Sequence, residues 1–238
     1  REALQMDPQQ RLLLEESYRA IEDAGLKLED LSGPRTGVYV GISSTDYSGI
    51  LNSYSNRNNI GNHSNTGNAA SIAANRISYT FNLKGPSFAV DTACSSGLVA
   101  THCALNGLSL GETDMALIAG VNIITFPELE VGFSMGGFLS SDGHCNTFDA
   151  SANGYIRSEG LGVILVKPLS KALENGDRIY AQILGSALNE DGRTNGLPMP
   201  NVDSQVSVLK DAYRDAGIDP KMVSLVEAHG TGTQLGDP

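Results

Sequence analysis

The sequence predicts a layered α/β fold in which helices cover a mainly parallel or mixed β-sheet. Apolar segments of strand length alternate along the chain with longer segments whose apolar residues recur at helical spacing. Several strand-length segments are apolar at nearly every position, which is typical of strands buried on both faces of a sheet. No linker-like change of composition interrupts the 238 residues, so we expect one domain.

The first part of the chain is expected to contain two helices and two strands. Residues 8–24 have apolar positions at helical spacing, and residues 69–79 return to helix. Residues 37–43 and 88–91 are short apolar segments that we predict to be strands. The intervening residues 44–67 are rich in Asn and Ser, which indicates a long surface excursion.

The next segment, residues 95–110, is apolar nearly all round the helical wheel, so we expect a helix that is buried on all sides. The same two periodicities predict the rest of the chain. They indicate strands at 116–124, 161–166, 180–188 and 224–228, and an amphipathic helix at 202–216.

The composition argues against several classes of protein. The formal net charge is −11, whereas nucleic-acid binding rewards clustered Lys and Arg. The longest apolar runs are too short to cross a membrane, so we expect no membrane partner. Three cysteines without a Cys-x-x-Cys pair argue against a disulfide framework or a zinc site, and we expect a cytoplasmic protein. The chain begins at Arg1 rather than at Met, which we interpret as the start of a fragment.

Cys94 is the strongest candidate for a nucleophile. It stands where the strand at 88–91 turns into the helix at 95–110, and the N–H groups of a helix start stabilise a thiolate and a developing oxyanion. Its small neighbours leave room for a substrate to reach the sulfur. A buried structural cysteine remains the alternative at this point. We expect Cys103 in the core and Cys145 in a loop without a chemical role.

A cysteine nucleophile needs an imidazole nearby, and His229 is the best placed of the four histidines. It ends the strand predicted at 224–228 and precedes Gly-Thr-Gly-Thr, and such strand ends are where sites assemble in α/β sheets. His102 lies about 12 Å from Cys94 along the helix axis, so we interpret it as a satisfied core histidine. His63 and His144 are expected at the surface.

Two strings of residues are specific enough to indicate a family. Asp91-Thr-Ala-Cys-Ser-Ser96 resembles the nucleophile motif of β-ketoacyl synthases, and Glu227-Ala-His-Gly-Thr-Gly-Thr-Gln-Leu-Gly-Asp-Pro238 resembles the first of their two histidine motifs. Further blocks similar to family segments follow in the family's order along the chain. They are Asp7-Pro-Gln-Gln-Arg-Leu12, Asn75-Arg-Ile-Ser-Tyr79, Phe148-Asp-Ala, Asn153-Gly-Tyr-Ile-Arg-Ser-Glu-Gly160 and Asn189-Glu-Asp-Gly-Arg-Thr-Asn-Gly196. The style is that of ketosynthases from type I polyketide synthases.

The resemblance implies a thiolase-like αβαβα sandwich and a decarboxylative Claisen condensation. Cys94 would receive an acyl chain from the phosphopantetheine thiol of an acyl carrier protein, and its backbone N–H would contribute to the oxyanion hole. His229 would help to bind and decarboxylate a malonyl-type extender, and Thr231 and Thr233 would bind substrate. The family implies a homodimer that acts on acyl and malonyl-type thioesters without a metal or a cofactor of its own.

The resemblance also implies that the chain is a single ketosynthase domain, truncated after the first histidine motif and incomplete in its C-terminal half. The family's second histidine and its catalytic lysine would lie beyond Pro238. We therefore expect residues 1–238 alone to lack condensing activity and to fold poorly. Gly97 stands where a serine is common, and Ile156 and Ser158 replace frequent glycines.

Four alternatives differ in chemistry from an elongating ketosynthase. A papain-like hydrolase also places its histidine downstream of the cysteine, but the Cys-Gly-Ser-Cys-Trp type signature is missing and the chain has no Trp. A non-decarboxylating thiolase or chalcone-synthase-like enzyme fits the histidine motif less well. A non-elongating ketosynthase, which accepts and passes on an acyl chain, would keep Cys94. A chain-length-factor protein would lack it.

Overall fold

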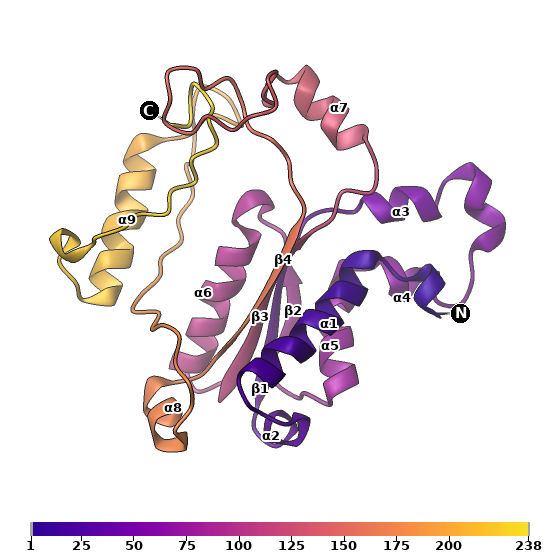
Figure 1. Ribbon diagram of the computed structural model, residues 1–238, viewed down its shortest axis with the longest axis vertical. Helices are drawn as coiled ribbons and strands as arrows, with labels where there is room; N and C mark the ends of the chain where they lie inside the picture. Colours follow the sequence, from indigo (N-terminus) through magenta and orange to yellow (C-terminus); the bar gives the residue numbers. More distant parts are fainter. Residues whose placement is uncertain (1, 238) are drawn as a thin grey trace. The chain divides into compact units, whose positions relative to one another are not determined.

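The computed structural model describes residues 2–237 of the chain (Figure 1). These residues form two compact units, each of which is described by itself. Unit 1 consists of Arg1–Phe126 and Ser158–Gln182, and unit 2 consists of Pro127–Arg157 and Ile183–Pro238. The nucleophile motif lies in unit 1 and the histidine motif lies in unit 2.

Unit 1 is built on a four-stranded mixed sheet. Its strands are β1 (Thr36–Ile42), β2 (Ser87–Val90), β3 (Met115–Asn122) and β4 (Gly160–Val166). Their order is β2-β1-β3-β4, with β2, β1 and β3 parallel and β4 antiparallel to β3. Every residue of β1 is buried, as expected for the central strand of a layered fold. All four strands were predicted from the sequence within two residues of their observed ends.

Helices cover both faces of this sheet, and Figure 1 shows α1 and α5 on one side and α6 on the other. The first face holds the larger apolar core, in which Leu13 of α1 and Ile77 of α5 pack against Val40 and Leu117. The second face holds a smaller core, in which Ala100 and Ala104 of α6 pack against Tyr39 and Ile118. Unit 1 is therefore a three-layer α/β/α arrangement, as the alternating pattern predicted.

The sequence locates the helices of the first layer well because their ends carry capping residues. Helix α1 (Pro8–Asp23) begins after Asp7, whose side chain accepts a hydrogen bond from the N–H of Gln9, and has proline in its first turn. Helix α5 (Ala70–Phe81) ends at Asn82 in the left-handed conformation. The surface excursion at 44–67 is mostly exposed, and it contains three short helices. They are α3 (Asp46–Leu51), η2 (Tyr54–Asn59) and α4 (Ser64–Asn68), and the other short helices of unit 1 are η1 (Glu2–Gln5), α2 (Leu28–Ser32), η3 (Ala93–Ser95) and α8 (Leu169–Asn175).

Helix α6 (Ser96–Ser109) corrects one prediction, because it is not buried on all sides. Ala100, Ala104 and Gly107 are buried against the sheet, whereas Leu98 is 75% exposed and Leu110 is 74% exposed. A helix that is apolar all round is buried on all sides only where a second layer covers the face that points away from the sheet. Within residues 2–237 the sheet of unit 1 covers one face of α6 and leaves the other open.

Gly41, one of a row of glycines across the sheet, lets the first turn of α6 approach the sheet closely. Gly41 of β1, Gly120 of β3 and Gly162 of β4 are neighbours in register across three strands. A Cβ atom on Gly41 would lie 2.5 Å from the backbone N of Gly97 and from the carbonyl carbon of Ser96, while one on Gly120 would lie 3.7 Å from the Cα of Gly97. The absence of a side chain at Gly41 thus sets the height of the α6 N-terminus above the sheet.

Unit 2 contains α7 (Glu128–Met135), α9 (Val202–Ala216) and η4 (Pro220–Met222). Helix α9 agrees with its predicted range because Asn201 caps its first turn and left-handed Gly217 ends it. The strands predicted at 180–188 and 224–228 are wrong, since both segments are irregular. A strand exists only where a neighbouring edge accepts its hydrogen bonds, and apolar composition alone does not supply that edge. No helix among residues 2–237 combines the length and the apolar character needed to cross a bilayer.

The close approach at Gly41 predicts that Gly41→Ala destabilises the fold by about 1–3 kcal/mol, because the added methyl group meets backbone atoms that cannot rotate away. Urea unfolding followed by circular dichroism measures the difference in the free energy of unfolding. Gly162→Ala is the matched control, since a Cβ there meets no atom within 4 Å. Equal stability of the two variants would contradict the proposed packing limit.

Candidate active site

The candidate nucleophile lies on a sharp turn between β2 and α6. Strand β2 ends at Val90, the single 3-10 turn η3 carries Cys94, and α6 begins at Ser96. Ala93, directly before Cys94, has φ 55°, one of three non-glycine residues with positive φ among those described. A left-handed conformation costs a non-glycine residue about 1–2 kcal/mol, so it persists only where the surroundings enforce it. Cys94 is exposed and is not part of a disulfide.

Side-chain hydrogen bonds hold this turn in place. Asp91 Oδ1 accepts a hydrogen bond of 2.9 Å from the Ala93 N–H. The Ser96 hydroxyl accepts one of 2.9 Å from the Thr92 N–H and donates one of 2.6 Å to the Ala93 carbonyl. The Ser95 hydroxyl donates to the Thr92 carbonyl at 2.9 Å. Small polar residues around Cys94 therefore shape the turn as well as leave space beside the sulfur.

These bonds leave one backbone donor of the turn without an acceptor. The N–H groups of Thr92 and Ala93 bind side chains, and those of Ser95 and Ser96 donate to the carbonyls of Thr92 and Ala93. Within the described part of the chain the Cys94 N–H has no such partner. A backbone donor beside a nucleophilic sulfur is placed to stabilise the oxyanion that forms when a thiolate attacks a carbonyl.

A small apolar hollow of ≈ 230 Å³ adjoins the strand that leads to Cys94. Strand β2 and helix α5 form most of its wall, and Asp91 is also part of the lining. The lining residues are Ile42, Ala70, Ser71, Asn75, Ser87, Phe88, Ala89, Val90 and Asp91.

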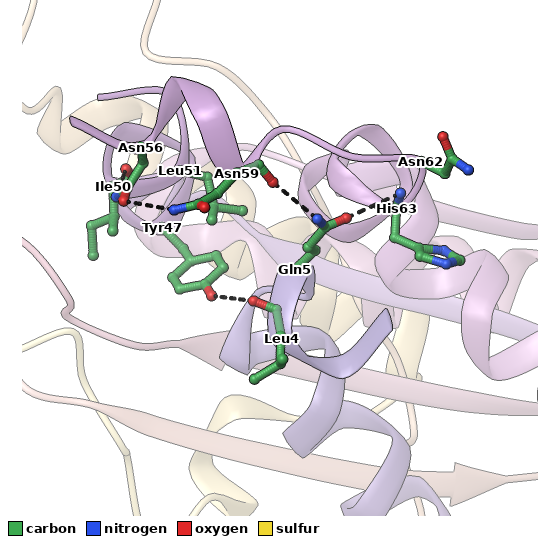
Figure 2. Close-up of a pocket in the computed structure, with 9 residues that line it drawn as sticks. All are labelled: Leu4, Gln5, Tyr47, Ile50, Leu51, Asn56, Asn59, Asn62 and His63. Atoms are coloured by element: carbon green, nitrogen blue, oxygen red, sulfur yellow. Dashed lines mark hydrogen bonds between the residues drawn. The ribbon is translucent and has the colours of Figure 1, made fainter. Parts of the chain in front are cut away.

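A larger hollow of ≈ 670 Å³ lies in the excursion at 44–67 and is separate in its lining from the candidate nucleophile. Figure 2 shows the Gln5 side chain crossing it, where Nε2 donates to the Asn59 carbonyl at 3.0 Å and Oε1 accepts from the His63 N–H at 3.2 Å. Tyr47 donates to the Leu4 carbonyl at 3.3 Å. The sequence predicted that His63 is a surface residue. It is instead half-buried and lines this hollow.

Two further residues that the sequence analysis weighed as partners or rivals of Cys94 lie on α6. Cys103 packs against the smaller core of unit 1, which contains Tyr39, as predicted. His102 is half-buried and has an interaction partner, which agrees with its interpretation as a satisfied histidine.

His229 lies in unit 2, exposed, where an extended irregular segment meets a glycine-rich loop. Gly230 and Gly232 have φ values of 51° and 67°, which a glycine adopts without strain. A Cβ on Gly232 would lie 3.1 Å from the Gly154 carbonyl oxygen, so the loop also packs closely on its neighbour. Pro238, the last residue of the histidine motif, lies outside the described residues.

The loop that follows His229 is bound to the segment that contains Phe148-Asp-Ala. Thr147 Oγ1 donates to the Gly230 carbonyl at 2.6 Å, and the Gly154 N–H donates to the Gly232 carbonyl at 2.9 Å. The Asp237 carboxylate accepts from the Phe148 N–H at 2.7 Å and from the Gly232 N–H at 3.0 Å. Two motifs far apart in the sequence therefore form one hydrogen-bonded structure.

This arrangement brings the two candidate substrate-binding threonines together. The hydroxyl oxygens of Thr231 and Thr233 are 3.1 Å apart, and both residues are partly buried. Thr233 Oγ1 also accepts from the Gly236 N–H at 3.0 Å. Paired hydroxyl groups suit the recognition of a neutral polar chain such as an amide-containing arm.

Three features of unit 2 were not found from the sequence. Cys145, interpreted there as a loop cysteine without a role, places its sulfur 3.3 Å from the Thr231 carbonyl oxygen. Asp237 organises the loop, and Phe148, with φ 59°, is a second left-handed non-glycine residue. The family-like strings around Phe148 and Asp237 were the available signal, but strings alone do not reveal that the two segments meet.

Hydrogen bonds also tune the carboxylates of this region. The hydroxyl of Ser140 and the His144 N–H lower the pKa of Asp142, and the hydroxyl and N–H of Ser151 lower the pKa of Asp149. Both groups are negatively charged at neutral pH. Each accepts hydrogen bonds within its own turn, so we assign them a structural role and no role in proton transfer.

Comparison with known proteins finds two family models that together span almost the whole chain. The family model described as the N-terminal domain of β-ketoacyl synthase matches residues 1–172, and the model of its C-terminal domain matches residues 180–238. The chain belongs to the β-ketoacyl synthase family. Its predicted thiolase-like fold is confirmed, because solved ketosynthases superpose on nearly the whole chain.

Relatives place this ketosynthase among those of polyketide synthases. The chain is 49% identical over its whole length to a component of the phenolphthiocerol/phthiocerol polyketide synthase of Mycobacterium tuberculosis and to polyketide synthase PksN of Bacillus subtilis. It spans 15% and 4% of the lengths of these two proteins. The papain-like and thiolase-type alternatives find no support here.

Two solved structures give the same result. The ketosynthase from module 6 of the bacillaene synthase of Bacillus subtilis 168 has a TM-score of 0.89 and 45% identity, over 98% of this chain and 39% of its own. The oxazolomycin ketosynthase domain OzmH KS7 of Streptomyces albus JA3453 has a TM-score of 0.94 and 38% identity, over 99% of this chain and 40% of its own.

The bonds to Asp237 predict that Asp237→Ala loosens the histidine loop. Hydrogen exchange at the amides of Gly232 and Phe148 should become roughly 10-fold faster, because each loses its acceptor. Mass spectrometry of peptides covering these residues in the full-length protein measures the change. Asp149→Ala, which removes a comparable acceptor from the Ser151 N–H, is the control, and equal exchange in both variants would refute the role of Asp237.

Proposed function

We propose that the ketosynthase of which this chain forms part catalyses the decarboxylative Claisen condensation of polyketide synthesis, as a 3-oxoacyl-[acyl-carrier-protein] synthase type of acyltransferase. The observation that supports this most directly is the turn at Cys94. It presents an exposed thiol beside a backbone N–H that has no other partner among residues 2–237. A nucleophile and an oxyanion donor on one residue suit acyl transfer.

In the first half-reaction the thiolate of Cys94 attacks the thioester carbonyl of an acyl chain on an acyl carrier protein. A sulfur–carbon bond forms, and the negative charge that develops on the carbonyl oxygen is stabilised by the Cys94 N–H. The bond to the phosphopantetheine sulfur then breaks, and the departing thiolate takes up a proton. The product is an acyl-Cys94 thioester and a free carrier thiol.

In the second half-reaction a malonyl-type extender on a carrier loses carbon dioxide. The electron pair of the broken carbon–carbon bond remains on the α-carbon as an enolate, and a hydrogen bond from the imidazole of His229 to the thioester oxygen stabilises it. The α-carbon attacks the acyl-Cys94 carbonyl, a new carbon–carbon bond forms, and the Cys94 thiolate leaves. The product is a β-ketoacyl chain on the carrier.

Thr231 and Thr233 bind the phosphopantetheine arm through their hydroxyl groups. Two observations support this assignment. The two hydroxyls lie close to each other, and Asp237 holds the loop that carries them by a hydrogen bond from the Gly232 N–H. The phosphopantetheine belongs to the carrier and is part of the substrate. The proposal assigns no metal and no cofactor to this chain itself.

The remaining assignments follow from the family. The two units form parts of one ketosynthase domain, which acts as a homodimer and accepts acyl and malonyl-type thioesters from an acyl carrier protein. The net charge of −11 supports a protein partner over nucleic acid. Cytoplasmic location is supported by three cysteines that form no disulfide within the described residues.

The proposal predicts that a short acyl thioester acylates the full-length protein at Cys94. Peptide mass spectrometry should find the acyl group on the peptide that contains Cys94, and Cys94→Ala should abolish it because no other thiol has the same turn. Cys145→Ala is the matched control, since Cys145 is also exposed and should leave acylation unchanged at Cys94. Acyl groups on Cys145 alone, or on no cysteine, would overturn the assignment.

A second prediction separates the two half-reactions. His229→Ala should keep acylation of Cys94 and lower condensation with a malonyl carrier by at least about 100-fold, because only the second step uses the imidazole. Product release from the carrier, followed by mass spectrometry, measures condensation. His144→Ala, an exposed histidine of the same unit, should leave both steps unchanged. Equal loss of acylation and condensation in His229→Ala would contradict this division of roles.

A further inference from the structure

We propose that Asp91 is a positioning residue for Cys94, and that it acts by holding Ala93 in the left-handed conformation. This inference rests on the proposed function, since it concerns the direction of the attacking sulfur and of the Cys94 N–H. Asp91 does not reach the reacting atoms itself. Its carboxylate accepts the hydrogen bond of the Ala93 N–H at 2.9 Å, one residue before the nucleophile.

The conformation of Ala93 is not held by packing. Ala93 is exposed, and so are its neighbours Thr92 and Cys94, so no buried surface keeps the alanine methyl group in place. An alanine left to itself prefers a negative φ. Hydrogen bonds to the two ends of the Ala93 residue must therefore enforce the observed φ of 55°.

Two side chains supply these bonds. Ser96, which is 5% exposed, binds the Ala93 carbonyl from the first turn of α6, and Asp91 binds the Ala93 N–H from the end of β2. Ser96 is fixed by the packing of α6 on the sheet, because a Cβ on Gly41 would meet its backbone. Asp91 is exposed and contributes little to the core, so its substitution tests the turn without removing buried contacts.

The consequence for Cys94 follows from backbone geometry. Rotation of Ala93 from the left-handed to the right-handed region would turn the peptide group that joins it to Cys94. The Cys94 N–H and the Cα–Cβ bond would then point in new directions, and displacements of about 1 Å at a reacting group cost up to 100-fold in rate. A tether on the Ala93 N–H keeps the sulfur and the N–H aligned for the same carbonyl.

The same device occurs a second time in the chain. Phe148, the left-handed residue of unit 2, also has its own N–H bound by an aspartate, Asp237, at 2.7 Å. The third left-handed non-glycine residue described, Asn82, is instead held as the cap of α5 by a backbone carbonyl. An aspartate therefore holds the strained residue at both candidate sites and not at the helix end.

The test compares three variants of the full-length protein. Asp91→Ala removes the acceptor, Asp91→Asn keeps an oxygen that can accept the Ala93 N–H, and Asp91→Ala/Ala93→Gly removes the need for a tether because glycine adopts positive φ without strain. The measured quantity is the rate constant for acylation of Cys94 at saturating acyl thioester, with its KM. We expect Asp91→Ala to lower the rate constant roughly 10-fold with little change in KM.

The two rescues give the decisive contrast. Asp91→Asn and the double variant should both return to within roughly threefold of the wild-type rate, although the double variant has no side-chain acceptor at position 91. Asp219→Ala is the matched control, because Asp219 accepts the Lys221 N–H at the same 2.9 Å on an exposed turn of unit 2, and it should behave as wild type.

The outcomes distinguish this inference from the proposed function. A wild-type protein that is not acylated at Cys94 refutes the function. Normal acylation of the wild type together with a wild-type rate for Asp91→Ala refutes the positioning role. A slow Asp91→Ala variant that Ala93→Gly does not rescue also refutes it, because the aspartate would then act on the reaction directly and not through Ala93.

Discussion

The rest of the structure depends on the contact between the first turn of α6 and strand β1. At Gly41 a side chain would lie 2.5 Å from the backbone of the helix, so the helix start rests directly on the sheet. Gly120 of β3 is the neighbour of Gly41 in register, and a Cβ there would lie 3.7 Å from the Cα of Gly97. Backbone atoms in close contact cannot rotate away as side chains can. The contact therefore fixes where β2 must turn into α6. The turn with Cys94 is therefore placed by a close backbone contact between α6 and the sheet of unit 1.

Strain at the candidate nucleophile is balanced locally. Ala93 takes a conformation that alanine disfavours, and the side chains of Asp91 and Ser96 hold its two ends. The same bonds occupy the surrounding N–H groups, and among residues 2–237 the Cys94 N–H has no acceptor. In the proposed reaction a strained turn serves chemistry in two ways, since it exposes the sulfur and supplies the donor that would stabilise the charge produced by its attack. The histidine loop of unit 2 uses a related solution, in which Asp237 binds the N–H groups of Phe148 and Gly232.

The sequence predicted much of unit 1 and little of the irregular parts of unit 2. Helices α1 and α9 and strand β4 were located closely because periodicity and capping residues are local signals. The segments at 180–188 and 224–228 are apolar enough for strands but lack a paired edge, which is a property of their neighbours. Helix α6 was expected to be buried on every side for a similar reason, since an apolar wheel does not say which faces are covered. Cys94 and His229 were selected by their positions and by the motifs around them, whereas Asp237 and Cys145 were not.

The sequence by itself determined the chemical identity of this protein. The residues around Cys94 and His229 are specific strings, and membership in the β-ketoacyl synthase family follows from them without coordinates. Only the tertiary structure decided how those residues are held. Three features depend on atoms that are distant in sequence or on a backbone angle. They are the left-handed φ of Ala93, the Cys94 N–H without an acceptor among residues 2–237, and the hydrogen bond from the Phe148 N–H to Asp237. Such angles depend on all the hydrogen bonds and packing contacts around a residue. A sequence motif does not specify those contacts.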